Sequence, residues 1–578
     1  MVRRLQIIFL LQLVGLLSAA ALSSPGTGLK HVVVVGAGFS GWGSVKSLLE
    51  AGGCRVTLLD ASDDPTGDMG TWTPSGKPFD AGQKGFWKDY PNVYSLLEGE
   101  IGVRMDDAFT PCTNSSFYSP FGLEATAPVF GDSQILPSPL GQVLASAQLF
   151  ERLPIADRAS VAGLLLAILD LTPETMAQWD KLTAQDLFER FGLSKRLVDD
   201  FLKPTLLVGL FKPPEELSAA VVMELLYFYA LAHQTSFDVR WIKKGSVAST
   251  VFKPLHAHLK QRHGEDLIVL PNSAVTEIVV SPDSMAVGRT ITYKAFDPQA
   301  RTTEQRVIED VDGVILAVGA KGLRSVLQTS PSLAQRAPEL ASAATMGSID
   351  CIAVRLWLDT KVPTRSPANV FANFDCLRGA GGTFFCLDQL QPDEAFLWGE
   401  GEGSAGVEGQ KGSVLACDFY NSAGLMALPD SELISMLTTK LLPTAVPAFS
   451  GVKVVDSFVK RYPGAVNHFA PGSFAKRPRT NVKGCDNLKM AGDWVWMGDR
   501  EPLSKGLCQE RAHVSGIEAA VSLARQLSLP GAGKVKPLPV RADEPQVQVG
   551  RAISKQLTDS LLRLPVAGGL LAKLLWPR

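Results

Sequence analysis

The sequence predicts a mixed α/β fold in which a parallel-sheet domain is interleaved along the chain with a mixed α+β domain and a helical insert. Three observations support this prediction. A run of valines and a glycine-rich turn occupy residues 30–41, a short apolar strand ending in Gly-Asp precedes a helix over residues 487–527, and apolar helical runs lie between them. Four consecutive valines are typical of a strand buried on both faces of a parallel sheet. We therefore expect a Rossmann-type domain that is assembled from both ends of the chain.

Length and composition limit the alternatives. The chain has 578 residues, of which 46% are hydrophobic and 20% charged, so it has enough apolar side chain to exclude a mainly disordered state. The 56 Lys+Arg and 58 Asp+Glu residues give a net charge of -2, which does not favour binding to nucleic acid. The length exceeds what one hydrophobic core normally serves, and this predicts two interlocked domains.

The N-terminal segment, residues 1–22, is set apart from the fold. Arg3 and Arg4 precede an apolar run from Leu5 to Leu22, and small residues near its end are typical of a signal-peptidase site. A signal peptide is the first interpretation. An uncleaved membrane anchor is the alternative, because about 18 apolar residues lie at the lower limit for spanning a bilayer. Either segment would bring the chain to a membrane system such as the secretory pathway.

The eight cysteines and seven histidines show no metal-binding pattern. No C-x-x-C, H-x-x-x-H or H-E-x-x-H spacing occurs, so we expect no metal site. A disulfide framework is unusual in a chain of this size. Free and mostly buried thiols are therefore expected.

The glycine-rich turn matches G-x-G-x-x-G and is followed by a helix-compatible stretch, Trp42 to Ala51, and a second strand, Arg55 to Leu59. In such a turn the glycines let a pyrophosphate approach the backbone N–H groups, and the helix N-terminus favours its negative charge. Asp60 ends the second strand, where its carboxylate can accept hydrogen bonds from ribose hydroxyls. The predicted dinucleotide-binding residues of this region are Gly36, Ala37, Gly38, Phe39, Ser40, Gly41 and Asp60.

A second constellation at the far end favours FAD over NAD. A nicotinamide enzyme needs little more than the first fingerprint, whereas here a strand ends in Gly-Asp and a helix over Ser504 to Leu527 follows. A helix N-terminus there would stabilise negative charge on a reduced flavin. The candidate residues for the ribityl and flavin end are Gly492, Asp493, Glu510, Arg511 and Ala512.

From residues 30 to 525 the sequence resembles the FAD-dependent amine-oxidase superfamily, and within it the phytoene and zeta-carotene desaturases. The segments that carry the resemblance, besides the fingerprint, are 79–93, 136–140, 214–218, 355–359, 463–473 and 491–493. The resemblance implies that Val275, in a strand from Ala274 to Val280, contacts adenine through its backbone. It also implies a plastid, such as that of an alga, as an alternative compartment.

Two departures from the family pattern stand out. The basic residue of the usual Gly-Gly-Arg or Gly-Gly-Lys is missing from residues 66–71, and neither Lys77 nor Lys84 can be assumed to replace it. Arg511 stands where the C-terminal helix of the family usually has the glycine of Glu-Gly-Ala. An arginine near a flavin would change its potential or reshape the substrate pocket.

The resemblance and the hydropathy pattern together divide the chain. The expected parts are the N-terminal segment 1–22, three parts of the FAD-binding domain at 30–100, 241–330 and 481–528, a helical substrate or cap insert at 101–240, a substrate-domain sheet at 331–480, and a C-terminal segment at 529–578. The insert is assigned from apolar runs at 161–169 and 225–231.

The C-terminal segment starts with a linker rich in Pro and Gly and ends in a basic amphipathic helix. Apolar residues recur there at mostly four-residue spacing, from Val549 and Ile553 to Leu564, with Arg551, Lys555 and Arg563 between them. Such a helix can lie on a membrane surface, or it can pack on the enzyme body. Both interpretations stay open.

The resemblance implies an FAD-dependent oxidoreductase that desaturates a hydrophobic, isoprenoid- or carotenoid-like substrate by hydride transfer to flavin N5. A quinone or oxygen would take the electrons, and a membrane surface would be a partner. An amine oxidase of the same fold and a non-redox flavoprotein, structural or an isomerase, are the alternatives. Desaturation needs no strong nucleophile, so no catalytic residue is assigned.

Overall fold

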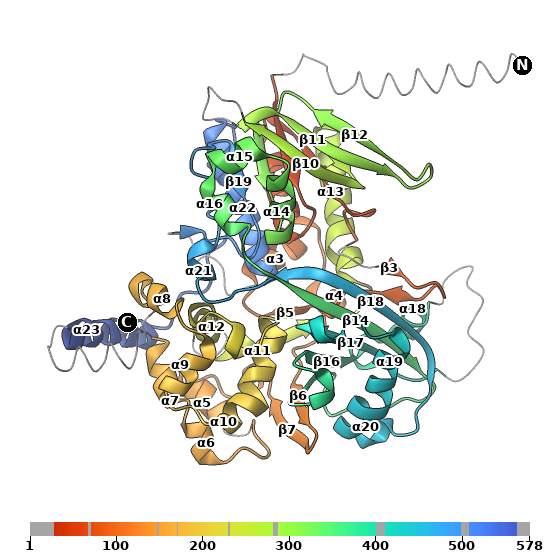
Figure 1. Ribbon diagram of the computed structural model, residues 1–578, viewed down its shortest axis with the longest axis vertical. Coiled ribbons are helices and arrows are strands. Elements are labelled where there is room, and N and C mark those ends of the chain that lie inside the picture. Colours follow the sequence, from red (N-terminus) through yellow and green to blue (C-terminus); the bar gives the residue numbers. More distant parts are fainter. Residues whose placement is uncertain are drawn as a thin grey trace, which may run out of the picture.

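A computed structural model describes residues 28–67, 71–146, 149–169, 171–228, 232–280, 287–399, 411–498 and 508–562. The predicted signal peptide or anchor, residues 1–22, lies outside these ranges. Figure 1 shows two lobes, with the parallel sheet in the upper one and a large antiparallel sheet beside a group of helices in the lower one. This mixed α/β architecture confirms the predicted fold class.

The upper lobe is built on a five-stranded parallel sheet with the order β19-β13-β1-β2-β9. Its strands are β1 (Lys30–Val35), β2 (Cys54–Leu59), β9 (Leu267–Leu270), β13 (Gly313–Leu316) and β19 (Leu488–Met490). The four valines of β1 lie at the centre of the sheet and are almost completely buried, because β2 and β13 flank them and helices cover both faces. As predicted, strands from distant parts of the chain complete one sheet.

Helices α2 (Phe39–Ala51) and α22 (Gln509–Gln526) lie against each other on one face of this sheet. Gly516 allows this, since a Cβ atom there would lie 2.1 Å from the backbone oxygen of Ser40. A Cβ at Gly43 would lie 2.8 Å from Nδ1 of His513, and Ser44 Oγ donates a hydrogen bond to the Gly516 carbonyl at 3.0 Å. Backbone contact between the two helices therefore joins the two ends of the chain. The α2 helix begins three residues before its predicted start, and residues 504–507 of the predicted last helix lie outside the described residues.

Other elements of the upper lobe form an antiparallel sheet of three strands and the helices around it. These elements are β10 (Ser273–Val280), β11 (Val287–Asp297), β12 (Thr302–Ile308), α13 (Lys253–His263), α14 (Ala320–Gln328), α15 (Pro331–Arg336) and α16 (Pro338–Ala343). Ser330, at the start of α15, accepts a hydrogen bond from the Ile278 N–H at 3.0 Å and fixes β10 to these helices.

The lower lobe contains a seven-stranded sheet with the order β18-β14-β17-β16-β15-β6-β7. Its strands are β6 (Ser115–Ser119), β7 (Gly122–Ala127), β14 (Ser348–Leu358), β15 (Ala368–Phe371), β16 (Gly381–Cys386), β17 (Val414–Tyr420) and β18 (Val454–Asn467). Helices α19 (Asp430–Met436) and α20 (Leu442–Ala445) pack on one face. The β6–β7 hairpin belongs to this sheet although it lies within the range predicted as a helical insert, because β6 pairs in parallel with β15.

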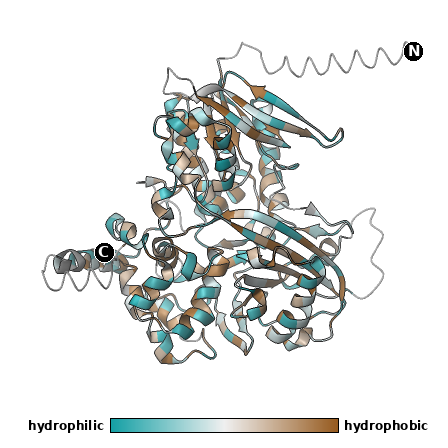
Figure 2. Ribbon diagram, viewed as in Figure 1, coloured by the Kyte–Doolittle hydropathy of each residue, from teal (hydrophilic) through white to brown (hydrophobic). Residues whose placement is uncertain are grey.

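Short helices form the rest of the insert. They are α5 (Leu140–Ser146), α6 (Ile155–Ala159), α7 (Ala162–Ala167), α8 (Pro173–Trp179), α9 (Ala184–Arg190), α10 (Lys195–Leu197), α11 (Lys203–Gly209) and α12 (Ala219–Leu226). Figure 2 shows that the insert carries both hydrophilic and hydrophobic residues. Among the described residues, no helix combines the length and the apolar character needed to cross a bilayer.

Further short elements connect the lobes or lie at their edges. They are β3 (Thr71–Trp72), β4 (Pro78–Phe79), β5 (Gly85–Trp87), β8 (Val239–Trp241), α3 (Pro91–Ser95), α4 (Met105–Ala108), α17 (Leu387–Leu390), α18 (Glu394–Leu397) and α21 (Ser473–Lys476).

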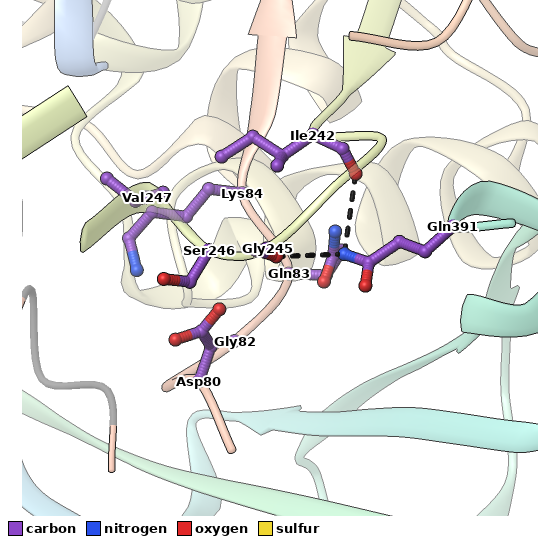
Figure 3. A pocket seen from close by; sticks show the side chains of 9 residues that line it. All are labelled: Asp80, Gly82, Gln83, Lys84, Ile242, Gly245, Ser246, Val247 and Gln391. Atoms are coloured by element: carbon purple, nitrogen blue, oxygen red, sulfur yellow. Dashed lines mark hydrogen bonds between the residues drawn. The ribbon is translucent and has the colours of Figure 1, made fainter. Parts of the chain in front are cut away.

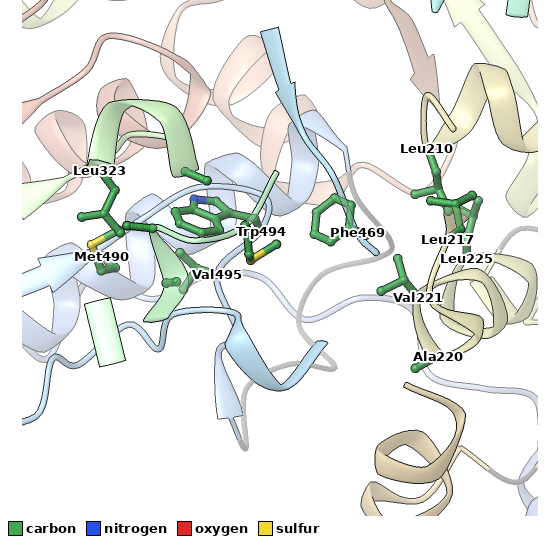
Figure 4. Packing of buried hydrophobic residues seen from close by; sticks show 14 of the residues in the cluster. Leu210, Leu217, Ala220, Val221, Leu225, Leu323, Phe469, Met490, Trp494 and Val495 are labelled. Carbon is green, nitrogen blue, oxygen red and sulfur yellow. The ribbon is translucent and has the colours of Figure 1, made fainter. Parts of the chain in front are cut away.

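One hydrophobic cluster continues from the insert into the parallel-sheet domain (Figure 4). It contains Val221 of α12 and Leu210 from the insert, and Trp494 and Met490 near β19, with Phe469 between the two groups. All five are less than 6% exposed. The insert is therefore fixed to the upper lobe by a shared core, and apolar side chains reach the end of β19.

We predict that Gly516→Ala destabilises the protein by about 3 kcal/mol or more, because the new methyl group would press on backbone atoms of α2 that cannot rotate away. Urea denaturation followed by circular dichroism measures the loss. Gly533→Ala is the matched control, since a Cβ there has no atom within 4 Å, and it should change stability by less than about 1 kcal/mol. Equal stability of the two variants would contradict the proposed importance of this helix contact.

Candidate functional site

The carboxyl ends of the parallel strands bring most of the predicted site residues to one edge of the sheet. Gly36 follows β1, Asp60 follows β2 and Gly492 follows the end of β19, and all these strands run in the same direction. Ligands of open parallel sheets bind at this edge, outside the strand ends. Residues from both ends of the sequence thus form one candidate site.

The three glycines of the turn are needed for different reasons. Gly36 has a φ of +101°, and a Cβ there would lie 2.4 Å from the Ala317 carbonyl oxygen. A Cβ at Gly41 would lie 1.8 Å from the carbonyl oxygen of Gly36. A Cβ at Gly38, by contrast, would have no atom within 4 Å. The protein itself therefore requires glycine at the first and third positions, while the space beside the second is left open.

The open space lies at the N-terminus of α2. Within the described part of the chain, the N–H groups of the four residues from Gly38 to Gly41 donate to no backbone or side-chain acceptor. Four free donors at the positive end of a helix form a site for an anion such as a pyrophosphate. The residues present therefore fit the phosphate portion of a dinucleotide.

Asp60 holds the turn in place. Its Oδ2 accepts a hydrogen bond from the Ala37 N–H at 2.7 Å, and its Oδ1 accepts from the N–H and the hydroxyl of Ser62 at 2.7 and 2.5 Å. Each oxygen keeps further acceptor capacity, because a carboxylate offers about four lone-pair positions. The ribose contact stays a prediction.

The backbone of Asp60 is also hydrogen-bonded to the first residue of β10. The Ser273 N–H donates to the Asp60 carbonyl at 2.6 Å, and Val275 follows two residues later on the same strand. Val275 is buried and pairs with Tyr293 of β11. The structure therefore brings Val275 near the ribose end of the candidate site, and its adenine contact stays a prediction.

The turn after β19 forms the other end of the site. Gly492 adopts a φ of +142°, and its N–H donates to Ser515 Oγ of α22 at 2.8 Å. Trp494 Nε1 donates to the Val318 carbonyl at 3.0 Å and fixes the turn beside the end of β13. Burial raises the pKa of Asp493 above its usual value, although Arg511 and Arg477 oppose the shift. Asp493 thus lies in a low-dielectric region near two cations.

Arg511 is completely buried and holds this turn through hydrogen bonds to its backbone carbonyls. Its Nε donates to the Asp493 carbonyl at 2.7 Å and another guanidinium nitrogen donates to the Val495 carbonyl at 3.0 Å. Arg477 donates to the Trp494 and Val495 carbonyls at 2.9 and 3.1 Å. The residue that departs from the family pattern therefore has a defined role in holding residues 493–495.

Glu224 of α12 lies between the two arginines. Its carboxylate oxygens are 3.7 Å from Arg511 and 3.6 Å from Arg477, and all three side chains are buried. A buried charge is costly unless it is paired, so each arginine offsets the burial of the carboxylate. The cluster connects the helical insert to the turn that follows β19.

The carboxylate of Glu510 contacts helix α3. It accepts hydrogen bonds from the Asn92 N–H and side-chain amide at 2.9 and 2.7 Å and from the Val93 N–H at 2.9 Å. Burial raises the pKa of Glu510 to about 7 despite these bonds. Ala512, two residues later in the first turn of α22, donates its N–H to the Cys508 carbonyl at 2.9 Å. Their cofactor contacts stay predictions.

Neither lysine singled out near the missing Gly-Gly-Arg lies at the free N–H groups of the glycine turn. Lys77 forms an ion pair with Asp456 and lies over the rings of Trp357 and Trp398, 5.1 and 5.7 Å from their centroids. This places Lys77 at the seven-stranded sheet. Lys84 donates to the Ala81 carbonyl at 3.1 Å and lines a pocket farther along the chain.

That pocket is small and polar, and at its edge the Gln391 side-chain amide donates to the carbonyls of Ile242 and Gly245 at 3.4 and 3.2 Å (Figure 3). It is lined by Asp80, Gly82, Gln83, Lys84, Ile242, Gly245, Ser246, Val247 and Gln391. On one side the Gln83 N–H donates to Oδ2 of Asp418 in β17 at 3.1 Å. On the other, the side-chain amide of Gln509 at the start of α22 donates to the Gly85 carbonyl at 3.4 Å. The pocket thus lies next to both the second sheet and the helix of the predicted flavin end.

The sequence prediction missed two charged residues beside this pocket. Asp418 occupies the otherwise apolar strand β17, and burial raises its pKa to about 6. Arg355 occupies the apolar C-terminal half of strand β14, and the sequence analysis named it only as part of a segment that resembles the family. A charged residue inside an apolar strand can be recognised in the sequence, because charged side chains are rarely fully buried unless they are paired.

Comparisons with known proteins agree with this geometry. A family model described as flavin containing amine oxidoreductase matches residues 46–522. A 15-cis-phytoene desaturase from Narcissus pseudonarcissus is 24% identical over 499 residues, which cover 83% of this chain and 78% of that protein. A carotenoid phi-ring synthase from Streptomyces griseus is 24% identical over 527 residues, which cover 86% and 89%.

Solved structures share the fold at lower identity. A cyclohexylamine oxidase from Brevibacterium oxydans has a TM-score of 0.58 at 14% identity, over 87% of this chain and 100% of that one. A putrescine oxidase bound to putrescine has a TM-score of 0.54 at 14% identity, over 86% and 99%. At this identity the similarity shows the fold alone.

We predict that Gly38→Val abolishes retention of the dinucleotide and leaves the ligand-free protein as stable as the wild type, because the new side chain enters the open space. Gly41→Val should instead prevent folding, because its side chain would collide with the Gly36 carbonyl. Acid release of the bound cofactor and thermal unfolding of ligand-free protein separate the two effects. Wild-type cofactor content in the Gly38→Val protein would refute the assigned turn.

Proposed function

Because the chain belongs to the flavin-containing amine oxidoreductase family, it is an FAD-dependent oxidoreductase, and we propose that it desaturates a hydrophobic, isoprenoid-like substrate. When bound, FAD supplies a hydride acceptor. The residues that would hold it are those of the glycine turn from Gly36 to Gly41, Asp60 and the turn at Gly492 and Asp493. The protein must then hold an apolar chain against this site and exclude water.

The observation that carries the proposal is the shared apolar cluster between the insert and the end of β19. Leu210, Val221 and Leu225 of the insert belong to the same cluster as Phe469 and Trp494. These buried side chains make the surroundings of the turn after β19 apolar. Apolar surroundings favour an apolar ligand, because burying apolar surface contributes about 25 cal/mol per Å2. The two curated relatives named above, a phytoene desaturase and a carotenoid ring synthase, support the same class of substrate.

Phe211 supports a substrate path between the insert and the sheet. It has a left-handed backbone with a φ of +62°, which is strained for an aromatic residue. Its ring contacts Tyr420 of β17 at a centroid distance of 4.8 Å. The surrounding packing holds this strained residue at the junction of the two parts, where its ring can shape the path of an apolar chain.

A membrane surface is part of the proposal, since a long apolar substrate has to come from a bilayer. Helix α23 (Pro545–Leu562) packs one side on the insert, where Val547 is buried and the Arg551 guanidinium lies 5.2 Å from the centroid of the Tyr227 ring. Its other side exposes Val549 and Ile553, by 58% and 51%. The packed side agrees with the interpretation that the segment lies on the enzyme body, and the exposed apolar side supports the proposal that it also contacts a membrane.

Helix α5 lies next to the start of α23 and also exposes apolar side chains. Ser138, just before α5, donates its N–H to the Glu544 carboxylate at 3.0 Å, one residue before α23. Leu140, Val143 and Leu144 of α5 are each at least half exposed. We propose that these two helices form one membrane-contacting surface, and that residues 1–22 act as the signal peptide or anchor that delivers the chain to that membrane system.

For the activity, we expect anaerobic 15-cis-phytoene in liposomes to bleach the flavin of the holoprotein and to yield a product lighter by two hydrogens. Visible absorbance and mass spectrometry of the extracted lipid measure both. Re-oxidation rates with a plastoquinone analogue and with oxygen identify the acceptor. Gly38→Val protein is the control without flavin.

Cyclohexylamine is the competing substrate in the same assay. Bleaching by this amine without bleaching by phytoene would replace the proposal with amine oxidation. A flavin that neither compound reduces would favour the non-redox alternative. Each of the three functions therefore has its own outcome.

For the membrane, we predict that the double variant Val549→Asp and Ile553→Asp weakens binding to anionic liposomes about tenfold or more, through lost apolar burial and added repulsion. Because both side chains are exposed, its melting temperature should match that of the wild type. Phe296→Asp on β11, which is 44% exposed, is the matched control and should bind like the wild type. Unchanged liposome binding by the double variant would refute the assigned surface.

A further inference from the structure

Arg355 is a buried cation next to the Phe79 ring, whose centroid lies 5.8 Å from the guanidinium carbon. Burial lowers its pKa, and the charges of Asp80 and Asp418 oppose this shift. Arg355 is 6% exposed, and among the described residues its guanidinium donates no hydrogen bond and forms no ion pair. The other buried arginines of the described chain, Arg477 and Arg511, each donate to two carbonyl oxygens. Buried polar groups in native proteins are almost always hydrogen-bonded, and an unpaired one is costly. The donors of Arg355 are therefore available to a ligand.

The position of Arg355 on β14 directs it toward the junction of the lobes. It pairs with Ala416 of β17, and Ala353, two residues earlier, pairs with Asp418, so Arg355 and Asp418 share one face of the sheet. The intervening residue Val354 belongs to the core on the opposite face, beneath α19 and α20. Arg355 thus lies on the face opposite α19 and α20, where Trp357 packs against Leu397 and Trp398.

The segment that lines the polar pocket crosses this same face. The guanidinium carbon of Arg355 lies 5.8 Å from the ring centroid of Phe79, which directly precedes the pocket residue Asp80. A Cβ at Gly82, another pocket residue, would lie 3.7 Å from Oδ2 of Asp418. The buried cation is therefore adjacent to the pocket that lies between the sheet and the start of α22.

From this juxtaposition we propose that Arg355 binds a carboxylate at one end of an otherwise apolar substrate. A planar guanidinium suits a carboxylate because it can form two parallel hydrogen bonds. The apolar cluster of the insert accommodates the rest of the molecule. The inference rests on the proposed function and deepens it, because it adds a polar end group to the isoprenoid-like substrate.

Four probes test the proposal on the holoprotein, through the change in flavin absorbance on binding. Geranylgeranoate and geranylgeraniol are an isoprenoid acid and alcohol of equal length, and benzoate and benzyl alcohol lack the isoprenoid tail. We expect each acid to bind the wild type about 10- to 100-fold more tightly than its alcohol. In Arg355→Gln this preference should disappear while the affinity for the alcohols stays unchanged.

Two further variants keep the result interpretable. Arg355→Lys retains the charge without the two-pronged geometry and should recover part of the preference for acids. Arg365→Gln removes an exposed arginine of the same sheet domain, paired only with Glu151 on the surface, and should behave like the wild type. Flavin content and melting temperature confirm that each variant is folded. If Arg355→Gln does not fold, the preference for acids measured with Arg355→Lys tests the proposal instead.

The outcomes separate this inference from the proposed function. Equal binding of acid and alcohol by the wild type, or a preference that survives in Arg355→Gln, overturns the carboxylate site. If benzoate shows the Arg355-dependent preference but the isoprenoid tail adds no affinity, the carboxylate site stands and the isoprenoid proposal fails. If none of the four probes binds, both are refuted.

Discussion

The close contact between α2 and α22 is the constraint on which the rest of the structure depends. The Ser44 hydroxyl and the Gly516 carbonyl, 472 positions apart in the sequence, are joined by a hydrogen bond across this contact. With a larger residue at Gly516 the two helices would separate, and the turn after β19 would move away from the glycine turn after β1. The cofactor site exists only because both turns reach the same edge of the sheet. A packing detail between two helices thus determines whether a dinucleotide can bind.

A second connection joins the site to the insert. Glu224, Arg477 and Arg511 are buried together, and the arginines hold the carbonyls of residues 493–495. Buried ion pairs add little net stability, because the charges have to leave water. Their directional bonds instead define one relative position of the insert and the turn. The apolar cluster stabilises the contact between the insert and the turn after β19. The charged cluster fixes how the insert and this turn are positioned relative to each other.

The fold could be predicted from the sequence where local pattern and burial coincide. The four valines of β1, the Gly-x-Gly-x-x-Gly turn and the apolar strand before Gly492 each carry their own signal. The β6–β7 hairpin could not be predicted, because its place in the sheet depends on pairing with β15, about 250 residues later. The site shows the same limit. The sequence placed Glu510 and Arg511 on the right helix, but only packing shows that one carboxylate contacts α3 and that the guanidinium holds a turn.

The split sheet also affects how the protein is made. β19 pairs with β13, and the hydrogen bond from Asn487 to the Asp312 carbonyl spans 175 positions. During synthesis the sheet therefore lacks its last strand, and α2 lacks its partner helix, until most of the chain has left the ribosome. Chains are synthesised at about 5–20 residues per second, so apolar faces stay uncovered for many seconds. FAD capture can only follow translation, and this interval is when a nascent chain of this topology most needs protection by chaperones.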